Sequence, residues 1–491
     1  MALGIKKGSI LLASLLFGTF GLHAVYRAQA QTADHGVSGP LAPVLAAVQG
    51  LGEPRPAVVT ASDGKVQLTA TADRGAVLHQ GDGIVQVEVT VKADALPGAP
   101  QRTPTDLVVV VDHSGSMQGQ KLDYAKQALL GLIDRLGPED RLGVVLFDHA
   151  ADVLFPLQSP VGSSRDHWRA LVRSISSAGG TSIGGGLDAG LSLISEPAQE
   201  RVTRVLLLSD GQDSSGLPAL TARARQITSR QGVLSTLGIG QDFDEQVMTS
   251  LASAGTGAFY YMAKPEVLPA MLDAELKTAT ETYASGAELH LRLGDGVRVT
   301  GAGGIPVETR GGEAVIPVGS LYAGRERKIW LGLSVPTDRL LERELGKLQL
   351  SYRRAGTTFE VSGTELPKVA CVADQTSYET RINPAVWGRG MVEEELNRAR
   401  EELGDAIARG TAQDVDRSVE RVESQRVLAE RLGQSQVVQE IVSLREDGSK
   451  AKLAQQADPM ARAVSAKTQK AIGYGKRNVS SYGSVDFTAG F

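Results

Sequence analysis

The chain has 491 residues, which is too long for one compact core and predicts roughly two to four domains. Its hydrophobic fraction of 42% and charged fraction of 22% are typical of a soluble globular protein, and its net charge of −5 argues against a general nucleic-acid binder. The only cysteine, Cys371, rules out an intramolecular disulfide and a Cys/His zinc cluster. We interpret this cysteine as a small buried hydrophobe.

Residues 1–30 have the pattern of a signal peptide. Lysines at positions 6–7 precede an apolar stretch over residues 9–25, and residues 28–30 match a small-x-small cleavage site, so the mature chain would begin near Gln31. An uncleaved anchor is the alternative, although the stretch is just short of the roughly 20 residues that a spanning helix needs. We therefore expect an exported protein, periplasmic, cell-surface or secreted, and the near absence of cysteine indicates a bacterial source.

Residues 31–58 are rich in proline, glycine and alanine, which predicts a linker. Residues 59–102 follow as a strand-rich segment. Within it, residues 65–71 and 84–92 alternate apolar and polar side chains, the period of a strand that is buried on one face.

Residues 103–283 change to continuous apolar runs that alternate with helical patterns. The apolar runs, typical of strands covered on both faces, are residues 107–111, 142–147, 205–208 and 233–239. The helical patterns are residues 122–136, 165–176, 186–194, 217–230, 244–254 and 267–282. This order predicts an α/β fold with a doubly wound, mostly parallel sheet.

Residues 284–373 return to alternation with a period of two. Because strand-rich segments lie on both sides of the α/β domain, the simplest architecture is a β-sandwich into which that domain is inserted. Residues 384–446 predict a helical hairpin, and residues 447–491 predict a basic, disordered tail. The tail could contact an anionic envelope surface or could act as a plain solubilising segment.

One set of oxygen-bearing side chains lies at predicted strand ends and turns. Asp112 ends the first buried strand and is followed by Ser114 and Ser116, while Asp210 ends another buried strand. Thr181 follows a glycine pair that can fold its hydroxyl inward. Ligands of doubly wound sheets gather at the carboxyl ends of the strands, and such hard oxygens suit Mg²⁺, Mn²⁺ or Ca²⁺. The sequence therefore predicts a divalent-cation site.

These five residues resemble the metal-ion-dependent adhesion site of the von Willebrand factor A-type (VWA) domain, whose pattern is Asp-x-Ser-x-Ser, then Thr, then Asp. The resemblance implies that Ser114, Ser116 and Thr181 contact the metal directly or nearly so. It also implies that Asp112 and Asp210 act partly through water, and that a carboxylate of a protein partner fills an open position. In related domains the last helix shifts on ligand binding, which here would involve residues 267–282. The flanking sandwich is similar to that of exported bacterial A-domain proteins and inter-alpha-trypsin inhibitor heavy chains.

Other polar patterns in the sequence favour simpler roles. His113, Asp148 and His149 are most simply loop residues, although His113 could contact a partner. Residues 180–184 match the Gly-x-Ser-x-Gly sequence of serine hydrolases, but that elbow requires a strand directly before the serine. We therefore expect a protein-binding adhesion or scaffold protein and not an enzyme. The alternatives are an assembly factor of an envelope complex that binds through its C-terminal helices and, less favoured, a protease-regulatory protein or hydrolase.

Overall fold

The structure of the protein is a computed structural model. It describes residues 58–95, 104–194, 201–210, 213, 216–240, 243–262, 268–409, 412–454, 465–466 and 469–470. The predicted signal peptide, residues 1–30, lies outside the described residues, as does the predicted linker except for its last residue, which begins strand β1.

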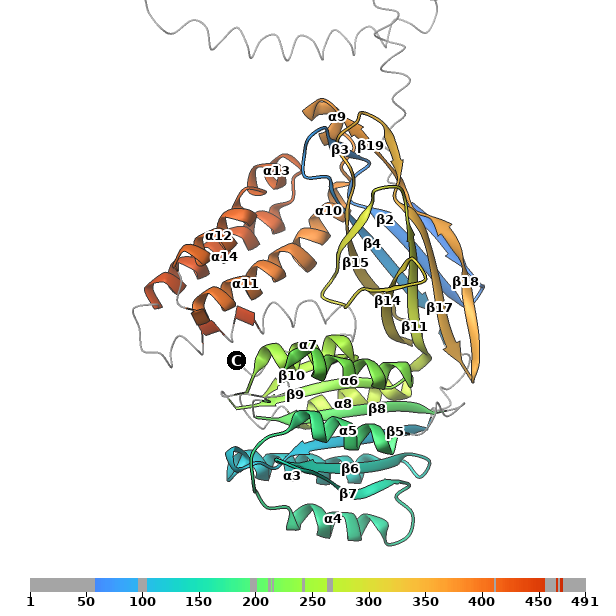
Figure 1. Cartoon of the computed structure of the whole chain (residues 1–491), viewed down its shortest axis with the longest axis vertical. Coiled ribbons are helices and arrows are strands. Elements are labelled where there is room, and N and C mark those ends of the chain that lie inside the picture. The colour runs from blue at the N-terminus through green and yellow to red at the C-terminus, as the bar shows by residue number, and fades with distance from the viewer. Residues whose placement is uncertain are drawn as a thin grey trace, which may run out of the picture. The chain divides into compact units, whose positions relative to one another are not determined.

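The central element is a six-stranded sheet with the strand order β10-β9-β8-β5-β6-β7 (Figure 1). Its strands are β5 (Thr105–Asp112), β6 (Arg141–Phe147), β7 (Ala151–Gln158), β8 (Val202–Ser209), β9 (Val233–Ile239) and β10 (Thr256–Met262). All neighbours pair in parallel except β7, which pairs antiparallel with β6. The sheet is therefore mostly parallel, as predicted, although the sequence pattern gave no sign of β7 or β10.

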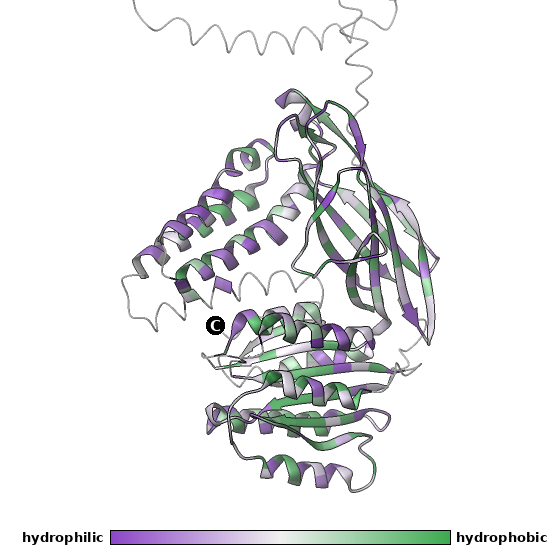
Figure 2. Cartoon of the chain, in the orientation of Figure 1, coloured by the Kyte–Doolittle hydropathy of each residue, from purple (hydrophilic) through white to green (hydrophobic). Residues whose placement is uncertain are grey.

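Helices cover both faces of this sheet, which explains its uninterrupted apolar strands. Every residue of β5 is buried: Val109 and Val111 pack into the core on one face, and Val108 and Val110 into the core on the other. The first face carries α3 (Gln120–Arg135), α4 (Ser164–Ser174) and α8 (Leu268–Thr280). The second carries α5 (Ile183–Leu193), α6 (Leu217–Ser229) and α7 (Glu245–Ala254). Figure 2 shows the hydrophobic colouring of the central strands.

Two antiparallel sheets form the predicted β-sandwich. The first has the strand order β1-β2-β4-β15-β12, and the second β13-β14-β11-β17-β18. Their bounds are β1 (Val58–Ser62), β2 (Val66–Ala72), β4 (Ile84–Ala93), β11 (Thr282–Leu293), β12 (Arg298–Ala302), β13 (Glu308–Arg310), β14 (Glu313–Tyr322), β15 (Glu326–Ser334), β17 (Gly346–Arg354) and β18 (Thr357–Glu365). Since β4 precedes the α/β domain and pairs with β15, which follows it, the α/β domain is an insertion in the sandwich.

A small third sheet has the order β16-β19-β3. Its strands are β16 (Glu342–Glu344), β19 (Lys368–Val372) and β3 (Ala76–Leu78). Cys371 lies in β19 and is 5% exposed, so its interpretation as a buried hydrophobe is confirmed. Burial raises the pKa of its thiol.

The C-terminal part is a helical assembly that is larger than the predicted hairpin. Its elements are α9 (Gln375–Glu379), α10 (Pro384–Gly390), a π-helical turn (Met391–Glu395), α11 (Leu396–Arg409), α12 (Ala412–Glu423), α13 (Arg426–Arg431) and α14 (Ser435–Ala454). Helices α11, α12 and α14 contribute apolar side chains to one core, and Figure 2 shows hydrophilic residues beside these on the same helices.

The prediction of a disordered tail from residue 447 is wrong for its first residues, because α14 continues through Ala454. Ala466 is buried in the helical core, and Lys470 Nζ lies 2.5 Å from Asp405 Oδ1. Gly448, where the basic stretch begins, is buried, and a Cβ there would lie 2.7 Å from Cγ2 of Val419. The missing side chain thus allows α14 and α12 to pack closely, a contact that composition does not reveal.

Gly448→Val is expected to lower the free energy of unfolding by about 1–3 kcal/mol, because the added side chain overpacks the contact with Val419. Urea unfolding followed by circular dichroism measures this change. Lys450→Val is a control on the same helix, because the side chain of Lys450 is 75% exposed. Equal stability of the two variants would contradict the close helix contact.

Candidate metal centre

The turn after β5 holds a buried carboxylate in a fixed orientation. Asp112, the last residue of β5, is 0% exposed. Its Oδ1 accepts a hydrogen bond of 2.8 Å from the backbone N–H of Ser114, and its Oδ2 accepts one of 2.6 Å from the hydroxyl of Ser209. The chain then passes through a 3₁₀ turn (Gly115–Met117) into α3. Each oxygen of Asp112 therefore accepts a hydrogen bond, which fixes the orientation of the carboxylate.

Three further oxygens converge beside this turn. The hydroxyl oxygens of Ser114 and Ser116 are 3.0 Å apart, and the Ser116 hydroxyl donates a 2.8 Å hydrogen bond to Oδ1 of Asp210. Asp210 directly follows β8, which pairs in parallel with β5, so both acids lie at the same edge of the sheet. Neighbouring oxygens around Mg²⁺ are separated by about 3 Å, since six of them surround the ion at about 2.1 Å. The spacing of these oxygens fits such an ion.

The two carboxylates make an electrostatically unfavourable pair without a cation. Burial raises the pKa of Asp112, the charge of Asp210 raises it further, and the hydrogen bonds from Ser209 and Ser114 oppose this only in part. Lys121 Nζ forms an ion pair with Oδ2 of Asp210. A divalent cation placed among these oxygens would relieve the repulsion.

Thr181 comes from a different loop, which the structure places against the same turn. The N–H of Gly115 donates to the carbonyl of Gly179 at 3.1 Å, and the N–H of Ala178 donates to the carbonyl of His113 at 2.8 Å. Thr181 lies two residues beyond Gly179 and is partly buried. The structure thus brings the loops of all five predicted ligands together, and the participation of the Thr181 hydroxyl stays a prediction.

The donor set fits a hard divalent cation in composition as well. Within the described ranges, no three His, Cys, Asp or Glu side chains gather closely enough to hold a metal, so any site here depends on hydroxyls. Serine and threonine hydroxyls with two carboxylates suit Mg²⁺, Mn²⁺ or Ca²⁺. Asp112, Ser114 and Asp210 are buried but Ser116 is exposed, so the set opens outward on one side.

Three neighbouring loop residues, His113, Asp148 and His149, follow the ends of the paired strands β5 and β6. Nδ1 of His113 lies 2.9 Å from the carbonyl oxygen of Ser176, and Nδ1 of His149 lies 3.1 Å from Oδ1 of Asp148. A hydrogen bond from the N–H of Ala150, with smaller contributions from the two histidines, lowers the pKa of Asp148. These contacts explain the three side chains as parts of the loop structure.

Two further residues, Ser209 and Lys121, contact the acidic residues of the site. Ser209 immediately precedes Asp210, and its contact with Asp112 appears only once β5 and β8 are known to be neighbours. Lys121 belongs to the first turn of α3, where a lysine ordinarily faces solvent. The sequence contains no local signal that would have singled out either residue.

The Gly-x-Ser-x-Gly sequence has a structural explanation that differs from a nucleophile elbow. Ser182 is the N-cap of α5, and its hydroxyl accepts a hydrogen bond of 3.3 Å from the N–H of Gly185. The segment between α4 and α5 contains no strand, whereas the elbow requires one directly before the serine. The hydroxyl of Ser182 therefore stabilises the start of a helix.

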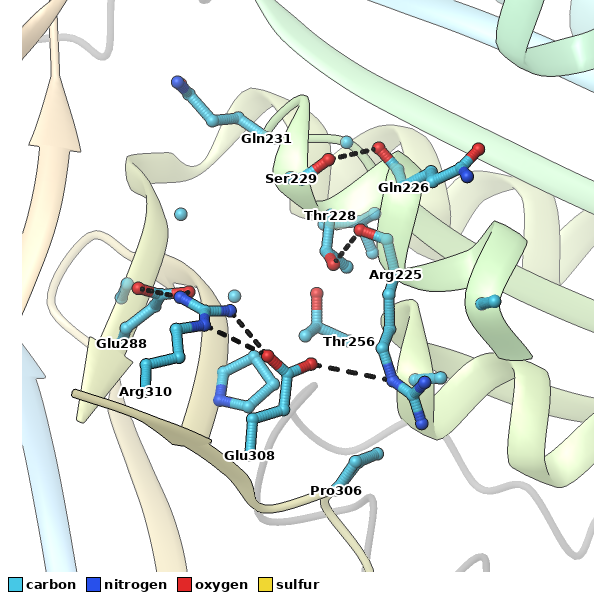
Figure 3. A pocket seen from close by; sticks show the side chains of 18 residues that line it. Arg225, Gln226, Thr228, Ser229, Gln231, Thr256, Glu288, Pro306, Glu308 and Arg310 are labelled. Atoms are coloured by element: carbon cyan, nitrogen blue, oxygen red, sulfur yellow. Dashed lines mark hydrogen bonds and ion pairs between the residues drawn. The ribbon is translucent and has the colours of Figure 1, made fainter. Parts of the chain in front are cut away.

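A pocket of about 480 Å³ with charged residues in its lining lies away from the metal edge, where α6 and the first residues of β9 and β10 meet strands β11, β13 and β14. Figure 3 shows Glu308 between two arginines. Its Oε2 lies 2.8 Å from Nη2 of Arg310, and its Oε1 lies 3.6 Å from Nε of Arg225. Arg310 also pairs with Glu288 at 3.0 Å. Since these charges pair with one another, we assign the pocket to the junction between the α/β domain and the sandwich.

Comparisons with known proteins agree with this fold. Residues 106–274 match the von Willebrand factor type A domain family. The chain is 29% identical over 293 residues to an uncharacterized protein of Synechocystis sp., a match that covers 57% of this chain and 68% of that protein. It is 26% identical over 171 residues to inter-alpha-trypsin inhibitor heavy chain H4 of Bos taurus, which covers 33% of this chain but only 19% of the heavy chain.

Two solved structures share the fold over most of the chain. A von Willebrand factor type A protein from Catenulispora acidiphila has a TM-score of 0.60 at 21% identity and covers 78% of this chain and 91% of its own. The ArnB paralog VWA2 from Sulfolobus acidocaldarius has a TM-score of 0.53 at 18% identity and covers 84% and 99%. At these identities the likeness concerns the fold alone.

The doubly wound sheet, its oxygen-rich edge and the family match define the class: the protein contains a von Willebrand factor type A domain. Domains of this class mediate protein–protein interactions, so a role in protein interaction or adhesion follows in general terms. Within the part of the chain that the structure describes, none of the helices has both the length and the apolar character needed to cross a bilayer.

Proposed function

We propose that the protein captures a protein partner through a divalent cation, preferably Mg²⁺, held by Asp112, Ser114, Ser116, Thr181 and Asp210. An Asp or Glu carboxylate of the partner completes the coordination of the ion. In this proposal the site binds and does not catalyse. The observation that carries it is the convergence of the Ser114, Ser116 and Asp210 oxygens at 2.8–3.0 Å beside the buried Asp112.

The charge of the ligand set supports the role of a partner carboxylate. Two carboxylates and three neutral hydroxyls supply only enough negative charge to balance a divalent ion. Lys121 neutralises part of that negative charge. A cation in this environment attracts an additional hard oxygen ligand, and an acidic side chain is the strongest one that a protein can offer. The exposed position of Ser116 leaves this side of the site accessible.

Export forms part of the same proposal. The signal-peptide pattern of residues 1–30 would place the mature protein in the periplasm, at the cell surface or in the medium, most simply of a bacterium. Adhesion and scaffolding both suit such a location, because extracellular Mg²⁺ and Ca²⁺ are abundant enough to fill a site of modest affinity.

Ser114→Ala is expected to abolish Mg²⁺-dependent partner capture, because it removes one hydroxyl of the converging set and leaves the fold intact. The immobilised mature chain is incubated with an extract of the source cells in Mg²⁺ and, separately, in chelator. The proposal expects a protein that the wild type retains in Mg²⁺ and releases in chelator, and that the variant does not retain.

Ser192→Ala serves as a matched control, since the Ser192 hydroxyl is exposed and donates only to the carbonyl of Ala189 in its own helix. This control should retain the same protein as the wild type. Capture that survives both chelation and Ser114→Ala would refute the metal-bridged mechanism.

Loss of capture on deletion of residues 389–491, with Mg²⁺ binding preserved, would instead favour an assembly factor that binds through its C-terminal helices.

A further inference from the structure

Lys121 forms an ion pair with Asp210, one of the two predicted acidic ligands. Its Nζ contacts Oδ2 of Asp210, while Oδ1 of the same carboxylate accepts the hydrogen bond from Ser116. The Asp210 side chain is fully buried, and the Lys121 side chain is 27% exposed. The ammonium group therefore reaches into the site from the solvent side and occupies one oxygen of a predicted metal ligand.

The surrounding backbone leaves room for this lysine. Lys121 is the second residue of α3, and Gly240 directly follows β9, which is the other neighbour of β8 in the sheet. A Cβ on Gly240 would lie 2.9 Å from Cε and 3.4 Å from Nζ of Lys121. Gly240 also has a φ of 80°, in the left-handed region that favours glycine. The lysine chain thus packs over a residue without a side chain and is directed toward Asp210.

We propose that Lys121 is an internal counter-cation that competes with the divalent ion for Asp210 and keeps the affinity of the site low. This inference rests on the proposed function, because it concerns the regulation of the same metal site. Asp112 and Asp210 together carry two negative charges, which Lys121 reduces to one. The ion must either displace the ammonium from Asp210 or bind beside it, and both cost affinity.

The same charge makes metal retention depend on the partner. With Lys121 present, the ion-loaded site carries one net positive charge, which a carboxylate of the partner would neutralise. Without Lys121 the loaded site is already neutral, and an outside carboxylate gains less from binding. Lys121 thus couples tight metal binding to partner binding: the ion is held weakly alone and firmly in the complex.

Lys121→Met is expected to bind Mg²⁺ about tenfold more tightly than the wild type, because a repulsive charge a few ångströms away is removed at a partly screened position. Isothermal titration of the metal-free, full-length chain with MgCl₂ measures this, and circular dichroism verifies the fold of each variant. Lys121→Arg retains the charge and should keep the low affinity. Lys126→Met, which removes a charge elsewhere on α3, should also match the wild type.

The outcomes separate this inference from the proposed function. If the wild type binds Mg²⁺ and folded Lys121→Met binds it equally or more weakly, the counter-cation role is wrong and the metal site stands. If Lys121→Arg gains affinity as Lys121→Met does, the effect is steric and the inference is again wrong. If neither the wild type nor any variant binds Mg²⁺, Mn²⁺ or Ca²⁺, the proposed function itself fails, and the inference with it.

Discussion

Asp112→Asn is expected to weaken Mg²⁺ binding by about a hundredfold and, at the same time, to raise the melting temperature of the metal-free protein. The loss of affinity follows from the removal of one of only two carboxylates at the site, and an outer ligand alone can contribute ten- to a hundredfold. The gain in stability follows from the burial of Asp112 at 0% exposure and from the charge of Asp210, both of which raise its pKa.

The sign of the pH dependence follows from that raised pKa. A carboxyl group whose pKa is higher in the folded than in the unfolded chain holds its proton more tightly in the folded state. Ionisation of this group therefore destabilises the folded state at pH values above its folded-state pKa. This destabilisation disappears at pH values below its unfolded-state pKa. The metal-free wild type should gain stability through this group as the pH falls across that window, and Asp112→Asn should lack this gain.

Thermal unfolding in chelator and in excess MgCl₂ tests both parts of this prediction. At a free Mg²⁺ concentration a hundred times its Kd, the wild type should be stabilised by about 2.7 kcal/mol, and Asp112→Asn should gain little. Asp152→Asn, a change at an exposed position of β7, serves as the control and should behave as the wild type does. An undiminished Mg²⁺ shift in Asp112→Asn would remove this residue from the ligand set.

Gly179→Ala is expected to reduce Mg²⁺ affinity by at least about tenfold without unfolding the domain. Gly179 has a φ of 66°, and its carbonyl accepts the hydrogen bond from the N–H of Gly115. A Cβ at this position would collide with the Asp148 carboxylate and lie 2.5 Å from Nδ1 of His149. The loop must then move, and Thr181, two residues further on, moves with it.

The adjacent glycine provides a closely matched control. A Cβ on Gly180 would meet no atom within 4 Å, so Gly180→Ala should leave Mg²⁺ binding unchanged. Titration calorimetry of the two variants compares the same chemical change at neighbouring positions of the same loop. Equal affinities would show that the position of this loop has no influence on the metal, and Thr181 would then lose its assignment as a ligand.

The two acidic residues of the predicted site lie close together because their positions in the sequence coincide with the ends of neighbouring strands. Asp112 and Asp210 each close an apolar run, and the carboxyl ends of neighbouring parallel strands share one edge of the sheet. The pattern predicted these strands because burial on both faces requires uninterrupted apolar residues. It missed β7, which has one buried residue and contains Pro156 and so does not form such a run, and it missed the extension of α14 beyond Gly448.

Sequence alone thus determined the fold class, because burial imposes a local period on apolar residues. It also predicted which oxygen-bearing residues lie near one another, because the carboxyl ends of parallel strands share one edge of the sheet. Tertiary structure alone decided the contacts between distant segments. It paired β4 with β15 across the inserted domain, placed the Ser209 hydroxyl on Asp112 and directed Lys121 to Asp210 over Gly240. The physical reason is that periodicity records whether a side chain is buried, whereas the identity of its neighbour depends on how the whole chain packs.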